Sequence, residues 1–353
     1  MHLFSCGINI FNQTFPKSAD NSELEFSIQS LKAISSKHVL FLNETSSIVI
    51  NSCGEIETWG LQFDLEDTQI THRSRITKKA FTEDTKKISG SKQLLYLLTD
   101  SGYIGRILSI NRDYIEYSLV EFDPSFNILN DHSRESRTSN TKKAEYQNIF
   151  VNDCAVNEFY LAVITNAGDF VLWDLKSFSS SSLVEPVFCI KADLRSNKIF
   201  SEVCCGKYHF LSRCKNGSVY SWSSLNIYSQ CGHGNMEVYE FPKQIQALSG
   251  INITNISCGY LHSAFVSSDG DLYTCGYNKY YQLGRGYSEH KKDGQFADLS
   301  INTADIDDFS IPEPVTEFVA NNKIAGLCPF VLSVHCGAGH TIFLLDFMAK
   351  TPG

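Results

Sequence analysis

A segment of about 30 residues occurs twice in close succession along this chain and returns elsewhere in weaker form. The better copy covers residues 258–286, CGYLHSAFVSSDGDLYTCGYNKYYQLGRG, and the other covers residues 205–234, CGKYHFLSRCKNGSVYSWSSLNIYSQCGHG. A repeat of roughly 50 residues predicts small structural units that stack against one another. The two copies share a cysteine, a histidine and a glycine at an offset of 53 positions: Cys258, His262 and Gly270 match Cys205, His209 and Gly217.

Each copy predicts two antiparallel strands joined by a tight turn. Residues 262–268, HSAFVSS, are apolar and β-branched, as in a strand that is buried on both faces. Asp269-Gly270 predicts a hairpin turn, because glycine adopts a positive φ without strain. Residues 271–276 supply the return strand, and Gly276 is expected to end it where another backbone comes close.

Weaker copies of this pattern precede the two clear ones. They place turn glycines at Gly54, Gly102 and Gly168, so that the five turn glycines are spaced 48, 66, 49 and 53 residues apart. The longest interval contains residues 124–147, which are polar, charged and without hydrophobic periodicity. We expect these residues to form an extended loop.

The two ends of the chain each carry half of a repeat. Residues 334–346, VHCGAGHTIFLLD, match the opening half, with His340 at the position of His262. Residues 3–15, LFSCGINIFNQTF, match the closing half, with Gly7 at the position of Gly276. We therefore expect the two termini to share one sheet, which closes a ring and removes two open sheet edges.

The combined pattern, CG-x-x-HS followed by DG-x-hydrophobic-aromatic-x-x-G-x-N-x-x-x-QLG, resembles the repeat of the regulator of chromosome condensation family. The resemblance implies an all-β fold, a β-propeller of four-stranded blades. Six blades are visible in the sequence, and the family's usual seven would require one cryptic blade. The layout is most similar to the small single-propeller relatives, the regulator-of-chromosome-condensation domain-containing proteins. We expect one propeller domain over residues 1–353, monomeric in solution.

Composition limits the classes of function. The net charge of −9 and the pI of about 5.6 argue against direct nucleic-acid binding as the main activity. No apolar run of about 18 residues predicts a membrane span, and no secretory leader is recognisable. The 12 cysteines are therefore expected to be reduced, in the nucleus or the cytoplasm and not outside the cell.

Nothing in the sequence predicts catalysis. The recurring His209, His262 and His340 invite a metal or catalytic interpretation, but a residue that returns in every unit of a ring is expected to be structural. There is no G-x-S-x-G or H-E-x-x-H motif, and no cysteine-histidine set at zinc spacing. We expect no enzyme, no cofactor and no metal.

One long departure from the repeat is the candidate for partner binding. Residues 286–314 interleave acidic and hydrophobic side chains, which suits a loop that becomes ordered on a partner or, alternatively, one that is merely solvated. Tyrosines just before and within it are either interface residues or packing between blades. The candidate partner-binding residues are Tyr277, Tyr280, Tyr281, Tyr287, Asp298, Asp305, Asp307, Asp308 and Phe309.

The residues themselves point to a non-enzymatic platform, since a propeller presents many variable loops on a rigid disc. The resemblance implies a chromatin-regulatory partner protein that acts with a JmjC-type histone demethylase or hydroxylase in chromosome segregation. The alternative that it implies is guanine nucleotide exchange on a small GTPase, although no hairpin in the sequence matches the wedge that performs it. A third is a partner of a small electron carrier in tRNA modification.

Overall fold

The computed structural model describes strands and connections from both ends of the chain. The residues described are 2–7, 27–30, 39–42, 46–50, 56–60, 74–77, 85–90, 94–110, 114–120, 150–176, 186–279, 282–285, 309–316 and 327–349. Among them, no helix is long and apolar enough to cross a membrane. Residues 124–147 lie outside the described part, as does all of the 286–314 segment before Phe309.

The described strands form six antiparallel sheets, which we number as blades 1 to 6. Blade 1 consists of β3 (Val39–Leu42), β4 (Ser46–Ile50) and β5 (Ile56–Gly60). Blade 2 consists, from the inside outward, of β7 (Thr85–Gly90), β8 (Leu95–Thr99), β9 (Ile104–Ile110), β10 (Tyr114–Leu119) and β6 (Ser74–Thr77). Blade 3 consists of β11 (Val151–Val156), β12 (Tyr160–Thr165), β13 (Phe170–Asp174) and β14 (Phe188–Ile190).

Blades 4 and 5 contain the two clear sequence repeats. Blade 4 consists of β15 (Phe200–Cys205), β16 (His209–Cys214), β17 (Val219–Ser223) and β18 (Lys243–Gln244), and the short helix η2 (Gln246–Leu248) follows it. Blade 5 consists of β19 (Ile253–Cys258), β20 (His262–Ser267), β21 (Leu272–Gly276) and β22 (Glu313–Pro314). Blade 6 consists of β23 (Leu327–Cys336), β24 (His340–Ala349), β1 (His2–Gly7) and β2 (Ser27–Ser30).

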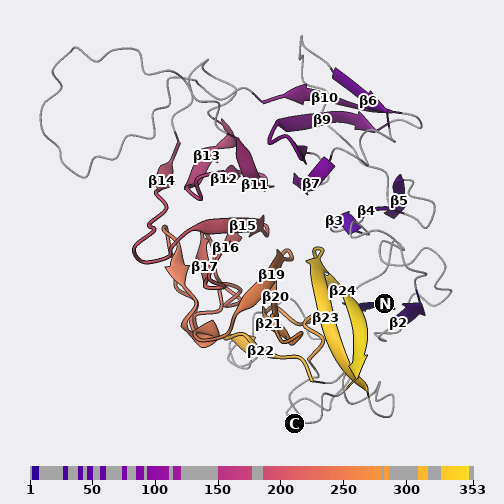
Figure 1. Cartoon of the computed structure of the whole chain (residues 1–353), viewed down its shortest axis with the longest axis vertical. Coiled ribbons are helices and arrows are strands. Elements are labelled where there is room, and N and C mark those ends of the chain that lie inside the picture. The colour runs from indigo at the N-terminus through magenta and orange to yellow at the C-terminus, as the bar shows by residue number, and fades with distance from the viewer. Residues whose placement is uncertain are drawn as a thin grey trace, which may run out of the picture.

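The blades close into a ring around a central axis (Figure 1). The innermost strands touch in sequence order from β3 through β7, β11, β15 and β19 to β23, and β23 touches β3. The two chain ends complete blade 6, because β1 pairs with β24 from His2 opposite Leu345 to Gly7 opposite His340. The predictions of an all-β propeller and of a terminal blade shared by both ends are confirmed. The described residues contain the six blades that the sequence shows.

Each innermost strand contains one extra residue. The pairing of every inner strand with the second strand of its blade shifts register once, and a β-bulge of this kind bends and twists the strand locally. The six described blades thus share this irregularity. The shifts fall at Val39/Phe41, Thr85/Lys87, Val151/Asp153, Phe200/Glu202, Ile253/Asn255 and Val331/Ser333.

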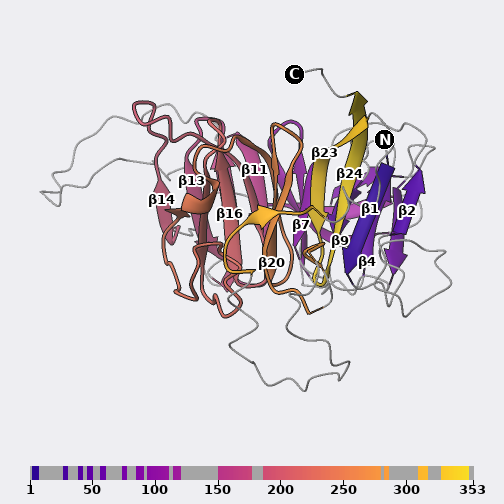
Figure 2. The ribbon, with the colours of Figure 1, turned by 90° about the horizontal axis from the view of Figure 1, so that it is seen from below.

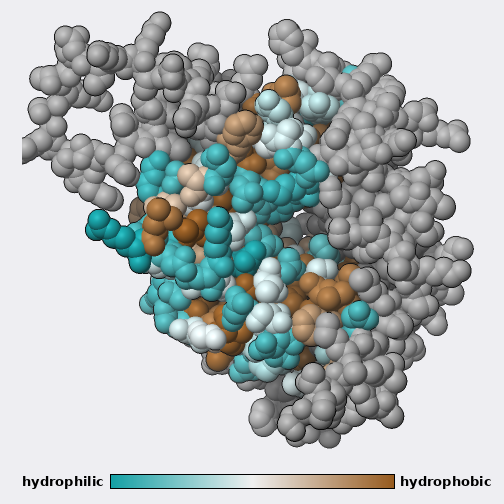
Figure 3. Space-filling model, in the orientation of Figure 1, coloured by the Kyte–Doolittle hydropathy of each residue, from teal (hydrophilic) through white to brown (hydrophobic). Residues whose placement is uncertain are grey.

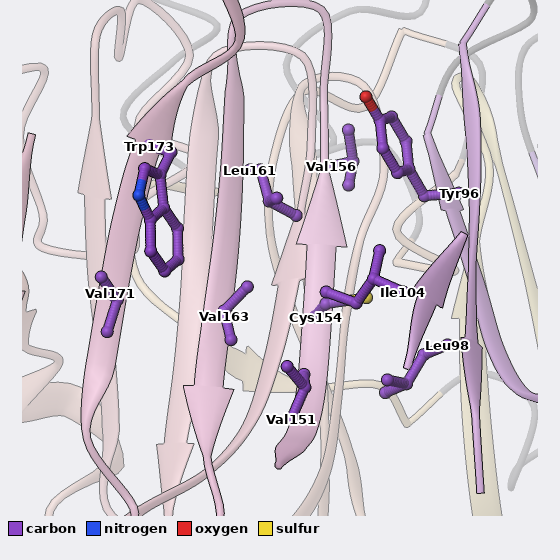
Figure 4. Close-up of a cluster of buried hydrophobic side chains, with 10 residues drawn as sticks. All are labelled: Tyr96, Leu98, Ile104, Val151, Cys154, Val156, Leu161, Val163, Val171 and Trp173. Carbon is purple, nitrogen blue, oxygen red and sulfur yellow. The ribbon is translucent and has the colours of Figure 1, made fainter. Parts of the chain in front are cut away.

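The hydrophobic core lies between blades. Figure 4 shows the cluster in which side chains of β8 and β9 in blade 2 meet β11, β12 and β13 in blade 3. Leu98 and Leu161 are fully buried there, and burying one such side chain contributes about 1.5–3 kcal/mol. Aromatic rings pack between blades 3 and 4 in the same way. The ring centroid of Phe170 lies 5.6 Å from that of Phe200 and 4.7 Å from that of Trp222.

The ring has two distinct faces, seen edge-on in Figure 2. The second and third strands of blades 2 to 5 are joined by tight turns at Gly102, Gly168, Gly217 and Gly270, with φ between 81° and 85°. We call the face that carries these turns the hairpin face. The opposite ends of the strands carry the connections that lead into the second strands, including residues 206–209, 259–262 and 337–340. We call that side the loop face.

Candidate interaction face

Two of the three recurring histidines, His209 and His262, lie between neighbouring blades. In blade 4, His209 Nε2 is 3.0 Å from the hydroxyl of Ser263 in blade 5, and Ser263 in turn donates to the carbonyl oxygen of Gln230 at 2.7 Å. Blade 5 repeats the arrangement, because His262 Nε2 is 2.9 Å from Thr341 Oγ1, which donates to the carbonyl oxygen of Gln282 at 2.6 Å. Each hydroxyl therefore fastens its own blade to a histidine and a loop of the blade before it.

The hydrogen-bond directions show which nitrogen of the His209 ring carries a hydrogen. Ser263 has one hydroxyl hydrogen, which it donates to Gln230, so it accepts a hydrogen from His209 Nε2. The buried Nδ1 of His209 has no hydrogen-bond partner that would stabilise a second proton, so the ring is neutral. Burial lowers the pKa of His209 and of His262 to about 3 and that of His340 to about 4. A group so strongly biased against protonation is a poor general base at neutral pH.

A second set of contacts between blades lies along the inner strands, and sequence reasoning missed it. Asp153 Oδ2 accepts the backbone N–H of Val203 in the next blade at 2.7 Å. Asn255 Oδ1 accepts the backbone N–H of Val334 in the same way at 2.8 Å. Both acceptors stand directly after a bulge. In blades 3 and 5 the residue after the bulge therefore accepts a hydrogen bond from a backbone amide of the next blade.

Charged partners accompany these acceptors. Lys87 Nζ lies 3.0 Å from Asp153 Oδ1, and Arg213 Nε lies 2.8 Å from Glu202 Oε2. Burial raises the pKa of Glu202, and the Arg213 guanidinium acts against that rise. The opposite charges are paired across blades 2 and 3 and within blade 4, as partly buried charges have to be.

The connections on the loop face are bound to one another. The backbone N–H of Lys207 donates to Tyr260 at 3.2 Å, and that of Tyr260 donates to Ala338 at 3.3 Å. The Asn157 side-chain amide contacts the carbonyl oxygens of Gly206 and Lys207, at 3.4 Å each. Connections from four consecutive blades thus form one rigid arc, residues 157–160, 206–209, 259–262 and 337–340, which we call the inner rim.

Aromatic side chains and one lysine lie along the inner rim. Phe159 stacks on Tyr208 at a ring distance of 6.4 Å. Lys207 Nζ lies 5.3 Å from the Tyr208 ring and 4.5 Å from the Tyr260 ring, and it donates to the Tyr260 hydroxyl. That hydrogen bond raises the pKa of Lys207. These side chains are half-exposed, so the rim presents flat aromatic area together with a positive charge.

Two of the candidate partner-binding residues lie in the described part of the chain. Tyr277 is half-exposed, and its ring lies 4.5 Å from that of Tyr228, which brings connections of blades 4 and 5 together. Phe309 is half-buried, with the Arg285 guanidinium 4.8 Å from its ring. Arg285 also pairs with Glu313 of β22. The contacts of Arg285 join the two ends of the interval 286–308.

The remaining candidates lie outside the described residues: Tyr280, Tyr281, Tyr287, Asp298, Asp305, Asp307 and Asp308. The last residues of the 286–314 segment belong to the propeller, because Glu313 and Pro314 pair with Thr274 and Tyr273 as the outer strand of blade 5. Within the described residues, no group of three or more histidine, cysteine and acidic side chains is placed to hold a metal ion.

Comparisons with known proteins agree with this architecture. A family model described as "Regulator of chromosome condensation (RCC1) repeat" matches residues 216–266 and 269–344, and a second model of the same repeat matches residues 253–282. Human WBSCR16 superposes with a TM-score of 0.54 at 16% identity, over 99% of this chain and 82% of that one. Prp20p of Saccharomyces cerevisiae gives a TM-score of 0.51 at 14% identity, over 99% and 92%. The chain is a β-propeller with RCC1 repeats.

Curated relatives match the RCC1-repeat propeller over shorter stretches. The ultraviolet-B receptor UVR8 of Arabidopsis thaliana is 30% identical over 146 residues, 40% of this chain and 32% of the relative. Human Protein RCC2 is 31% identical over 154 residues, 42% of this chain and 28% of the relative. The chain thus spans about a third or less of the length of these relatives. The names of these relatives do not assign one activity to this chain.

Proposed function

We propose that this RCC1-repeat propeller is a non-enzymatic platform that captures a protein partner on its loop face. The observation that carries the proposal is the inner rim, whose backbone hydrogen bonds hold Tyr208, Lys207 and Tyr260 in place before a partner arrives. Half-exposed aromatic side chains on a rigid support lose little conformational entropy on binding. Tyr277 extends the same surface outward, which fits its role as a candidate contact.

The hairpin face is a weaker candidate for this role. Figure 3 shows the hairpin face, in the orientation of Figure 1. In its coloured part the hydrophobic residues lie in separate patches with hydrophilic residues between them. Scattered apolar residues of that kind are ordinary for a protein surface.

The test is affinity capture from cell extract, followed by mass spectrometry. We expect the double variant Lys207→Glu, Tyr208→Ala to lose about fivefold or more of its main partner, a loss of about 1 kcal/mol. The control is Lys215→Glu, an exposed lysine beside the Gly217 turn on the hairpin face, which should retain the partner. Equal capture by the double variant and the control would contradict the proposal.

We further propose, on the resemblance of the layout, that the partner is a JmjC-type histone demethylase or hydroxylase and that the protein acts in chromatin regulation and chromosome segregation, in the nucleus. Yeast Prp20p, which shares the fold, was studied with its binding to Gsp1p and histones. Co-purification of a JmjC protein with the wild type, but not with the rim variant, would support this assignment. Accelerated GDP release from a small GTPase would instead favour the nucleotide-exchange alternative.

A further inference from the structure

Two cysteines of neighbouring blades meet at the centre of the ring. The sulfur of Cys204 in β15 lies 3.1 Å from the sulfur of Cys258 in β19. Both belong to innermost strands, and the two strands contact each other. Cys204 is half-buried, whereas Cys258 is only 7% exposed. A disulfide bond of about 2.05 Å would require the two sulfurs to approach by about 1 Å.

On the inner strands of blades 2 and 5, a serine occupies the position equivalent to Cys204, and it makes a hydrogen bond to the next blade. Ser89 Oγ accepts the backbone N–H of Val156 in the next blade at 2.8 Å. Ser257 Oγ accepts the backbone N–H of Cys336 in the same way at 2.9 Å. Cys204 stands at this position in blade 4, and its side chain meets the sulfur of Cys258, the last residue of the next inner strand. A thiol is a weak acceptor. The serine hydrogen bond that joins two other pairs of blades is therefore replaced by two neighbouring thiols between blades 4 and 5.

Other described cysteines near this point have different partners. The Cys205 thiol donates to the carbonyl oxygen of Val156 at 3.0 Å, and Cys336 Sγ lies 3.8 Å from Thr341 Oγ1. Burial raises the pKa of Cys205 to about 12. Cys204 and Cys258 differ from these cysteines because their sulfurs lie directly against each other, 3.1 Å apart.

We propose that Cys204 and Cys258 form an oxidisable pair, a modification site at which a peroxide converts two thiols into a disulfide that joins blades 4 and 5. Hydrogen peroxide oxidises the Cys204 thiol to a sulfenic acid, and one water leaves. The sulfur of Cys258 then attacks the Cys204 sulfur, the S–S bond forms, and the hydroxyl leaves as a second water. In total, two thiols and one peroxide give one disulfide and two waters.

The roles of the two cysteines follow from their surroundings. Cys204 is the more exposed of the two and meets the peroxide first. Burial raises the pKa of the Cys258 thiol well above its usual value, which keeps it a thiol and makes it the slower of the two to react with peroxide. It takes the second step because its sulfur lies 3.1 Å from the Cys204 sulfur, on which the sulfenic acid forms. The bond would close a loop that contains β16, β17, β18 and β19, so blade 4 could no longer separate from blade 5 by breaking hydrogen bonds alone.

The experiment uses the full chain, reduced and then exposed to hydrogen peroxide in the presence of a metal chelator. Free thiols are then blocked with N-ethylmaleimide, and the digested protein is analysed by mass spectrometry. We expect a peptide pair linked through Cys204 and Cys258, lighter by two hydrogens than the sum of its parts and separated by dithiothreitol. We also expect the oxidised protein to melt at a higher temperature than the reduced protein.

Two variants make the outcome specific. Cys204→Ser should abolish the linked peptide and the rise in melting temperature, and it should fold, because a serine at this position is what Ser89 and Ser257 already supply at other junctions. Cys205→Ser should retain both effects. Peroxide that leaves Cys204 and Cys258 fully alkylated, or that oxidises Cys204 to a sulfinic acid without linkage, would overturn the proposal. Linkage of Cys204 to other cysteines in equal yield would do the same.

Discussion

At the scale of single residues, a few positions decide how closely the blades approach. Gly270 adopts a φ of 81°, and a Cβ atom built there would lie 2.4 Å from the ring of Phe330 in the next blade. The glycine is thus required twice, for its backbone conformation and for the room it leaves. The buried histidines act at the opposite end of the same strands, where a neutral ring fits between two blades.

The first prediction separates these two requirements at Gly270. Gly270→Ala should lower the free energy of unfolding by about 1–3 kcal/mol through backbone strain, and by a further ~1–3 kcal/mol through the clash with Phe330. Gly250 is the matched control, because it has a φ of 84° and nothing lies within 4 Å of a Cβ built there. Urea unfolding should therefore show a clearly larger loss for Gly270→Ala than for Gly250→Ala. Equal losses would mean that the contact with Phe330 is unimportant.

The second prediction concerns pH. The folded-state pKa values of His209, His262 and His340 are about 3, 3 and 4, below the ordinary value of about 6.5. Between these values the unfolded chain binds more protons than the folded chain, so stability is complete above about pH 6.5 and is lost as the pH falls. At pH 5, each histidine should lower the free energy of unfolding by about 2 kcal/mol, because a difference of one pKa unit corresponds to about 1.4 kcal/mol.

The measurement is the free energy of unfolding between pH 7.5 and about pH 5. A His262→Gln variant should show a shallower decline than the wild type, because one of the three rings no longer takes up a proton on unfolding. A decline of the same slope in both proteins would contradict the buried neutral state of His262.

At the scale of strands and turns, much of the fold could be predicted from the repeat. The turn glycines gave the strand pairs, and the matching halves at the two ends gave blade 6. The two-residue strand β22 could not be predicted, because Glu313 and Pro314 are too short a stretch to show a period of two. The acceptors Asp153 and Asn255 were missed for a related reason, since a bulge leaves no fixed residue pattern.

The candidate site was predicted less well than the fold. Tyr277 was proposed as a contact because it stands in a tyrosine cluster, which the sequence displays directly, and that role stays a prediction. Lys207, Tyr208 and Phe159 were not singled out, because they approach one another only when connections of blades 3 and 4 are brought side by side. Tyr160, His209 and His262 each begin the second strand of a blade. An alignment of these positions would have placed Phe159 and Tyr208 side by side and revealed part of the rim.

The third prediction tests the hydroxyl that joins blades 4 and 5. Ser263→Ala leaves His209 Nε2 without its partner, and it leaves the Gln230 carbonyl oxygen with only the 3.8 Å contact from the Cys275 thiol. The free energy of unfolding should fall by about 1–3 kcal/mol. Ser224→Ala is the control, because Ser224 is exposed and its hydroxyl makes a long contact of 3.4 Å with Tyr208. Thermal unfolding that does not distinguish the two variants would reject the bridging role.

At the scale of the whole molecule, stability depends on ring closure. The pairing of β1 with β24 joins residues from opposite ends of the chain, Leu3 opposite Leu344. Every other blade that the structure describes is built from strands of one continuous region. Blade 6 is therefore the place where the circular arrangement is made or lost.

The fourth prediction is that removing His2–Gly7 destabilises the entire ring. The deletion leaves β24 as an open edge and separates β2 from its blade, so several kcal/mol should be lost. We expect the melting temperature to fall by about 10 °C or more, or the protein to aggregate. Removal of the residues after Ala349, which lie beyond the last strand, is the control and should have little effect. A melting temperature unchanged by the first deletion would contradict closure through β1.

The pairing of β1 with β24 also has a consequence for synthesis on the ribosome. The strand His2–Gly7 is translated before the other strands that the structure describes, whereas its neighbour His340–Ala349 is the last of them to be translated. A nascent chain that stalls before His340 leaves the early strand unmatched and available to chaperones or proteases. Completion of the circle thus requires that the strands of all the described blades have been made, and copies that stop before His340 are distinguished by the strand they fail to cover.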